Sequence, residues 1–88
     1  MQALDGNAIA GQLYWHFGRE MTAARGSCEH CGTAAAIGEL AVYIRGPGSV
    51  VRCRHCGQVV MVLVDVGEET HVYANAFQLD RGSDAPGR

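Results

Sequence analysis

The sequence predicts a small α+β, metal-stabilised domain in which a zinc-ribbon-like antiparallel sheet is joined to an N-terminal amphipathic helix. Three observations predict this fold class. Two Cys-x-x-Cys pairs, each followed by glycine, are separated by 21 residues, apolar residues near the N-terminus recur with helical spacing, and a valine-rich run follows the second cysteine pair. We expect a single domain over residues 1–79 and a flexible tail over residues 80–88, where the sequence becomes polar.

The first element that we expect is a helix over residues 6–17. Asp5 or Asn7 can cap its start, and Gly18 can end it. Apolar side chains that recur every four residues share one helix face, and here they are Ile9, Leu13 and Phe17. This face should be buried against the sheet.

The remaining elements should be strands. Residues 21–27 are expected to be an extended or irregular link, and residues 40–45 a strand that the Gly-Pro-Gly-Ser turn at 46–49 folds into a hairpin. Residues 59–66 are almost all apolar and β-branched, which predicts a central strand, and residues 70–77 predict another. Both faces of the central strand need cover. The helix can cover one, and the metal-bearing hairpins or a second subunit can cover the other.

The length of the chain limits how this fold can be stabilised. With 88 residues the core is small, and such domains usually need disulfides or a bound metal. The N-terminus lacks the basic start and long apolar run of a secretory signal, and no segment has the length of a membrane span. We therefore expect a cytoplasmic protein, and in reducing surroundings paired cysteines are more often metal ligands than disulfides.

The cysteines predict one metal site. Their spacing is close to that of four-cysteine zinc sites, and the four expected ligands are Cys28, Cys31, Cys53 and Cys56. Gly32 and Gly57 follow the second cysteine of each pair, where a residue that tolerates positive φ lets a tight turn close. Four protein sulfurs leave no coordination position for substrate, so the site should be structural and the protein should not be an enzyme.

The histidines are expected to lie outside the metal site. His30 and His55 occupy equivalent positions between paired cysteines and should point to solvent, although ligation by either is an alternative. His16 should lie on the helix surface and His71 on a strand, and neither has a carboxylate that the sequence places beside it as a base would need.

Zinc is the expected metal, and iron is the alternative. Paired Cys-x-x-Cys-Gly segments in a small acidic domain also resemble rubredoxins, which use a four-cysteine iron site for one-electron transfer. This sequence departs from them in the second pair, where Arg54 and His55 stand in place of the usual proline, and in its N-terminal helix and valine-rich strand.

A second resemblance covers Leu4 to about Leu79. The opening Leu-Asp-Gly-Asn-Ala-Ile-Ala-Gly at 4–11, the Phe17-Gly18 stop and the two cysteine pairs around a Gly-Pro-Gly turn resemble an uncharacterised actinobacterial zinc-ribbon domain family. The resemblance implies a zinc site on the four cysteines and no established activity. Members of that family are often encoded near oxidoreductases, so the resemblance also implies a redox enzyme as partner.

We expect the protein to be a noncatalytic accessory module that binds another protein. Trp15 lies roughly opposite the apolar helix face, where it is either an exposed anchor or packed over the ribbon. The residues expected to bind a partner are Trp15, Tyr14 and Gln12. A homodimer is a further option.

Nucleic-acid binding is the alternative function. Three arginines lie near the second cysteine pair, namely Arg45, Arg52 and Arg54. Against this, the formal net charge is −2 and becomes more negative when zinc binds four thiolates. Affinity for phosphate backbones comes mainly from clustered Lys and Arg, so nucleic acid is the less favoured partner.

Overall fold

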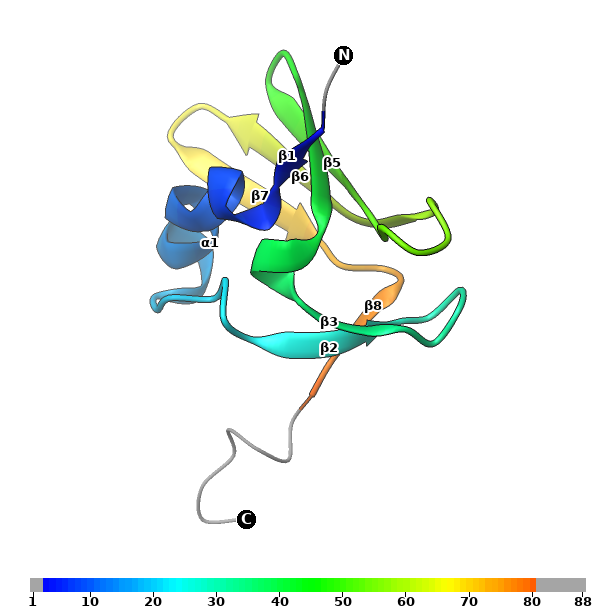
Figure 1. The fold of residues 1–88 in the computed structure, drawn as a ribbon. Coiled ribbons are helices and arrows are strands. Elements are labelled where there is room, and N and C mark those ends of the chain that lie inside the picture. Colours follow the sequence, from blue (N-terminus) through cyan, green and yellow to red (C-terminus); the bar gives the residue numbers. More distant parts are fainter. Residues whose placement is uncertain (1–2, 81–88) are drawn as a thin grey trace, which may run out of the picture.

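Two antiparallel sheets and an N-terminal helix form the fold in the computed structural model, which describes residues 3–80 (Figure 1). The larger sheet has the order β1-β4-β5-β6-β7, with bounds β1 (Leu4–Asp5), β4 (Ala41–Arg45), β5 (Gly48–Arg52), β6 (Val59–Val66) and β7 (Glu69–Tyr73). The smaller sheet has the order β3-β2-β8, with bounds β2 (Arg25–Cys28), β3 (Ala34–Ala36) and β8 (Phe77–Leu79). These sheets and the helix confirm the α+β prediction.

The N-terminal helix begins and ends at the expected residues. The Asp5 side chain accepts a hydrogen bond from the Asn7 backbone N–H at 3.1 Å, and Gly18 ends the helix with φ 78°. Its first turn is a 3₁₀ helix, η1 (Gly6–Ile9), and only α1 (Ala10–Phe17) is α-helical. Glycine and asparagine in this turn disfavour the α-helix, which explains the difference from the single helix predicted over residues 6–17.

Gly6 lies where η1 crosses a second 3₁₀ helix, η2 (Ile37–Glu39). A Cβ atom at position 6 would overlap the backbone carbonyl of Ile37. We expect Gly6→Ala to lower the free energy of unfolding by about 1–3 kcal/mol, the usual cost of overpacking. Thermal denaturation measures the change. In the control Gly11→Ala the new methyl meets nothing within 4 Å, and alanine should stabilise α1 by about 0.5–1 kcal/mol; equal losses in both variants would contradict the close approach.

The core lies between α1, η2 and the inner sides of both sheets. Its fully buried members are Ile9, Leu13, Ile37, Val42, Val51 and Leu63. The prediction for Phe17 is wrong, since this side chain is 41% exposed. Phe17 is the last residue of α1, and helical spacing shows that side chains share a face but not how far the covering surface extends.

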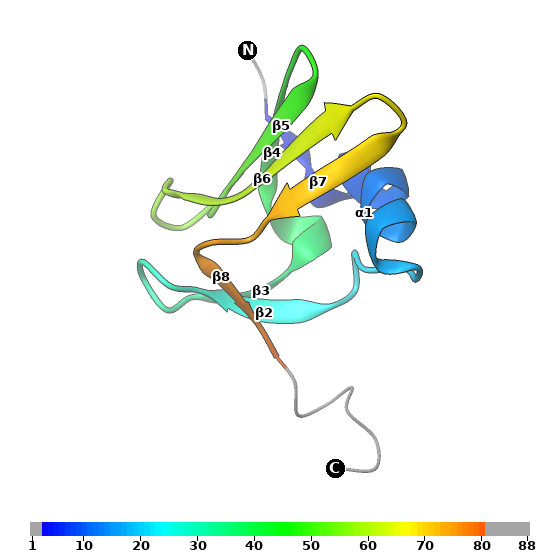
Figure 2. The ribbon, with the colours of Figure 1, turned by 180° about the vertical axis from the view of Figure 1, so that it is seen from behind.

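The valine-rich strand is confirmed as β6, which lies between β5 and β7. Met61 and Leu63 on the inward face are buried, and so is Val60 beside the irregular register at Val51/Arg52; on the opposite face Val62 and Val64 are half-buried and Val66 is 56% exposed. Figure 2 shows β6 and β7 in front of α1, with no helix or strand of the described chain over this opposite face. The helix covers one face as expected, and the metal-bearing hairpins do not cover the other.

Two other segments differ from the prediction. Residues 21–27 contain the start of β2, which was missed because Arg-Gly-Ser carries no β-branched side chain. The single strand expected over residues 70–77 divides into β7 and β8, which belong to different sheets. The chain crosses between the sheets at 74–76, where the Ala76 N–H donates to the Val60 carbonyl and the Ala76 carbonyl accepts from Glu29 N–H.

The predicted hairpin over 40–52 is confirmed. Register pairs Arg45 with Gly48, so the loop is Gly46-Pro47 and β5 begins two residues earlier than expected. At the other end of the chain, the Asp80 N–H donates to the Arg25 carbonyl at 2.8 Å, and the rest of the expected tail, 81–88, lies outside the described residues. In the part of the chain that is described, each helix is too short to cross a membrane.

Candidate metal centre

The two cysteine pairs form two tight turns of the same geometry. In the first, the Gly32 N–H donates to the Cys28 carbonyl at 2.7 Å, and in the second the Gly57 N–H donates to the Cys53 carbonyl at 2.9 Å. Both glycines have positive φ, 81° and 80°, which a Cβ would disfavour. Local sequence alone therefore closes each turn, which we call a knuckle.

The backbone of each knuckle also donates to its first sulfur. The His30 N–H lies 3.3 Å from Cys28 Sγ, and the His55 N–H lies 3.3 Å from Cys53 Sγ. N–H groups aimed at sulfur stabilise the thiolate form, which is the form that binds a metal. The backbone of each knuckle thus favours a negatively charged sulfur even without a bound ion.

The two knuckles bring all four sulfurs together. Every pair of Sγ atoms lies within 4.8 Å, and two pairs, Cys28 with Cys56 and Cys31 with Cys53, are 3.7 Å apart. A disulfide would need about 2.05 Å. In a tetrahedron with metal–sulfur bonds of about 2.3 Å the sulfurs are about 3.8 Å apart, so the observed spacing fits four thiolates around one ion.

Burial and hydrogen bonding differ among the four ligands. Cys28 and Cys53 are buried, Cys56 is half-buried and Cys31 is exposed. Hydrogen bonding with Thr33, mainly with its side-chain oxygen 3.2 Å from the sulfur and also with its backbone, lowers the pKa of Cys31 to about 6. The pKa of Cys56 rises to about 11, because burial and the neighbouring thiols outweigh a favourable backbone hydrogen bond from Gln58.

Thr33 was not identified from the sequence. In the structure it affects how strongly protons compete with a metal for the Cys31 sulfur. Protons compete with the metal for thiolates, so raising the pKa of a ligand lets the metal leave at higher pH. Thr33→Val removes the hydroxyl that lowers the pKa of Cys31. We expect the pH at which half of a bound zinc is released to increase by a few tenths of a unit, measured with a chromogenic zinc indicator. Release at unchanged or lower pH would contradict this role.

The histidines lie outside the sulfur cluster, as predicted. Within residues 3–80, the group of side chains able to share an ion contains the four cysteines alone. The ring of His30 does not point freely into solvent, since its Nε2 lies 3.2 Å from the Val59 carbonyl and ties the first knuckle to the start of β6. His16 Nδ1 lies 3.1 Å from the Thr70 carbonyl, and His71 Nε2 lies 3.6 Å from a Glu69 carboxylate oxygen.

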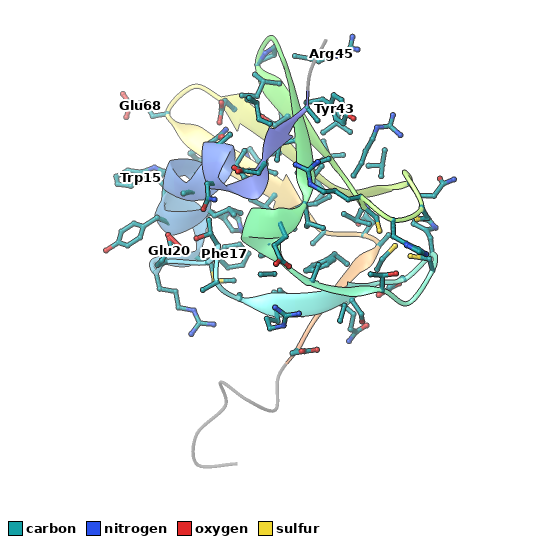
Figure 3. The ribbon with its side chains drawn as sticks, in the orientation of Figure 1. Trp15, Phe17, Glu20, Tyr43, Arg45 and Glu68 are labelled. Atoms are coloured by element: carbon teal, nitrogen blue, oxygen red, sulfur yellow. The ribbon has the colours of Figure 1, made fainter. Side chains whose placement is uncertain are left out.

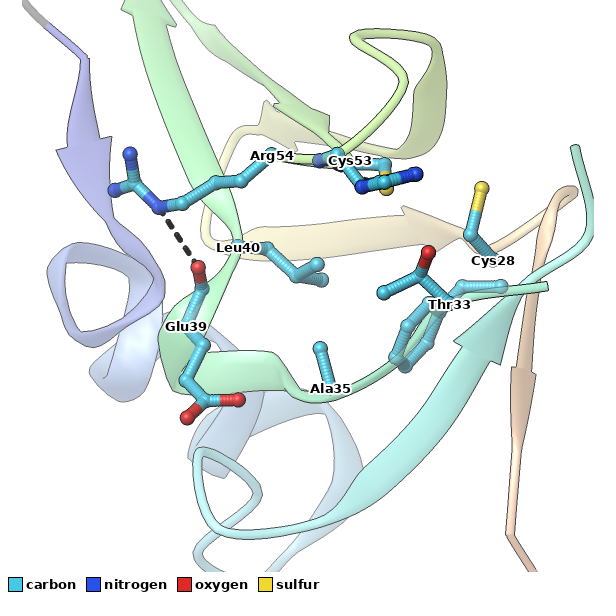
Figure 4. A pocket seen from close by; sticks show the side chains of 9 residues that line it. Cys28, Thr33, Ala35, Glu39, Leu40, Cys53 and Arg54 are labelled. Carbon is cyan, nitrogen blue, oxygen red and sulfur yellow. Dashed lines mark hydrogen bonds between the residues drawn. The ribbon is translucent and has the colours of Figure 1, made fainter. Parts of the chain in front are cut away.

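A cavity of about 310 Å³ lies beside the cluster, between the two sheets (Figure 4). It is lined by Cys28, Thr33, Ala35, Glu39, Leu40, Cys53, Arg54, His55 and Phe77. Arg54 braces one side, because its Nε donates to the Glu39 carbonyl at 2.8 Å and its Nη2 to the Leu4 carbonyl at 3.3 Å. The guanidinium therefore joins the second knuckle to β1 and η2.

The three arginines of the nucleic-acid alternative are not brought together. Arg54 is engaged with backbone carbonyls as described, whereas Arg45 and Arg52 lie with Tyr43 around a shallow hollow on the larger sheet. Arg52 donates to the Gly57 carbonyl at 2.8 Å and lies over the Tyr43 ring. Only two of the three share a surface, and one of those two already has partners.

The three helix residues expected to bind a partner also differ in their surroundings. Trp15 projects from α1 (Figure 3), is 73% exposed and lines a shallow hollow with Glu69 and His71 of β7, and Tyr14 is 55% exposed. The alternative that Trp15 packs over the ribbon is therefore wrong. The Gln12 amide donates to both carboxylate oxygens of Asp65 at 3.1 and 3.2 Å, so Gln12 fastens the helix to β6.

Comparison with known proteins gives a family and no function. The model of a family of unknown function, DUF6510, matches residues 1–80. No curated protein and no solved structure matches the chain. The expected membership of a family without known function is thus confirmed. The sulfur cluster is the strongest indication of what the chain binds.

Proposed function

Because the chain belongs to the DUF6510 family, whose function is unknown, we propose a function from its own geometry: a noncatalytic zinc protein that binds another protein. The observation that carries the proposal is the convergence of four sulfurs at tetrahedral spacing, with two of the four cysteines buried. Four protein ligands complete the coordination of zinc and leave no position for water or substrate. Such a site supplies stability rather than catalysis.

Zinc and iron are separated by a single measurement. Both metals accept four thiolates, and the knuckle geometry suits either. We expect the purified protein to be colourless and to contain one zinc per chain by elemental analysis. Strong visible absorption with one iron per chain would replace this proposal by one-electron transfer.

The binding surface that we propose is the exposed side of α1. Tyr14 and Trp15 are adjacent large aromatic side chains on a helix whose opposite side is fixed in the core by Ile9 and Leu13. Exposed aromatics on a rigid element are typical anchors of protein interfaces. A redox enzyme is the partner class that the family resemblance implies.

Affinity capture from native cells tests this surface. A Tyr14→Ala, Trp15→Ala variant should lose a protein that the unmodified chain retains, while its zinc content and melting temperature stay unchanged. The matched control is Leu4→Ala, which removes an exposed apolar side chain, 47% exposed, from a different element. Equal capture by the double variant would reject this surface.

A further inference from the structure

The face of the larger sheet that points away from α1, which we call the outer face, has an apolar central row, and Arg45 and Arg52 lie beside that row around Tyr43. Its central row runs straight across four strands, because register pairs Tyr43 with Val50, Val50 with Val62, and Val62 with Tyr73. The valines are half-buried and Tyr73 is 50% exposed. An antiparallel sheet can leave one face in water, but that face is then usually polar.

The central row reads the same in both directions, Tyr-Val-Val-Tyr. A two-fold axis that runs parallel to the strands, between β5 and β6, would place β4 over β7 of a second copy and β5 over β6. Tyr43 would then lie against the partner's Tyr73, and Val50 against the partner's Val62. The row is therefore complementary to itself under the symmetry that most homodimers use.

The next row obeys the same symmetry. It contains Arg45, Gly48, Val64 and His71, as the register shows. Under the two-fold axis Gly48 lies against the partner's Val64, so the position without a side chain faces the bulkier one. Two sheets that pack face to face with strands within about 30° of one another form a standard sandwich.

Charged side chains at the two edges of the outer face are also related by this two-fold axis. Arg45 is exposed on β4 and makes no hydrogen bond or ion pair within residues 3–80, and Glu69 is exposed on β7, paired only with His71 at 3.6 Å. Figure 3 shows Arg45 and Glu68, which neighbours Glu69, at the ends of separate hairpins. The axis places Arg45 against the partner's His71, and Glu69 lies 3.6 Å from that ring, so the cation at one edge comes close to the anion at the other.

We propose that a second copy of this chain covers the outer face and forms a symmetric, face-to-face dimer. The face spans four short strands, which is small for a protein interface, so the dimer should dissociate on dilution. The dimer is an interaction separate from the proposed partner binding, although Trp15 of α1 lines a hollow with Glu69 and His71 at the edge of the outer face.

Sedimentation of the zinc-loaded protein over a range of concentrations tests the dimer. We expect the unmodified chain to pass from monomer to dimer as its concentration rises. Arg45→Glu and Glu69→Arg should each weaken the dimer at least tenfold through like-charge contact, and the double variant should recover most of the loss by restoring opposite charges. Arg25→Glu, on the smaller sheet, is the control and should change nothing.

Circular dichroism and zinc content verify that each variant is folded. A chain that stays monomeric at all concentrations would overturn the proposal, as would a double variant weaker than either single one. Equal weakening by Arg25→Glu would also overturn it, because the effect would then come from net charge. Binding of single-stranded nucleic acid to a persistent monomer would assign the outer face to a different partner.

Discussion

Removal of the metal should unfold the domain. Cys28 ends β2 of the smaller sheet, whereas Cys53 directly follows β5 of the larger sheet, so one ion joins the two sheets. Structural zinc contributes about 10–16 kcal/mol of binding free energy at neutral pH, while a whole domain is stable by only about 5–15 kcal/mol. We expect a strong chelator, or Cys53→Ser, to abolish the cooperative thermal transition and the near-ultraviolet circular dichroism.

Adding zinc back to the chelated chain provides the control. Returning one equivalent of zinc to the chelated chain should restore the signal, whereas magnesium, which prefers oxygen ligands, should not. The same addition should fail to restore Cys53→Ser fully, since three sulfurs remain. A chelated chain that keeps its cooperative transition would show that the hydrophobic core alone stabilises the fold. The metal would then not be needed for folding.

The metal site was predictable because its geometry is local. Each knuckle needs only two cysteines, a glycine and backbone hydrogen bonds within five residues, and the sequence repeats this unit twice. The helix ends were predictable for the same reason, since Asp5 and Gly18 act on neighbouring backbone groups. The presence of β6 followed from its composition.

What could not be predicted depends on contacts between distant segments. Arg54 follows a cysteine and resembles a free cation, yet its hydrogen bonds reach Leu4 and Glu39, which the sequence does not place nearby. Gln12 is drawn away from the helix surface by Asp65 in the same manner. The separation of β7 from β8 depends on where two sheets meet, and hydrophobic alternation continues through that point without a break.

Phe77→Ala should destabilise the domain about as severely as any change outside the cysteines. The ring is 4% exposed, packs over Gly26 and lines the cavity beside the sulfur cluster. Register pairs Phe77 with Cys28 across β8 and β2. Truncating a buried phenylalanine costs about 3–5 kcal/mol, which is a large part of the stability of a domain of this size.

The only other phenylalanine of the chain is the control. Phe17 is 41% exposed at the end of α1, so Phe17→Ala should change the free energy of unfolding by well under half of the loss at Phe77. Chemical denaturation of both zinc-loaded variants measures the difference. Similar losses would mean that the ring of Phe77 does not belong to the core.

The same pair of variants shows whether zinc binding and folding are one process. If the chain without metal is unfolded, zinc must supply the folding free energy, and a loss of 3–5 kcal/mol at Phe77 lowers the apparent zinc affinity by about 10²- to 10⁴-fold. If the metal-free fold stands by itself, the affinity hardly changes. Competition with a chelating dye separates the two results, and a large decrease for Phe77→Ala with little change for Phe17→Ala would identify the sulfur cluster and the core as one cooperative unit.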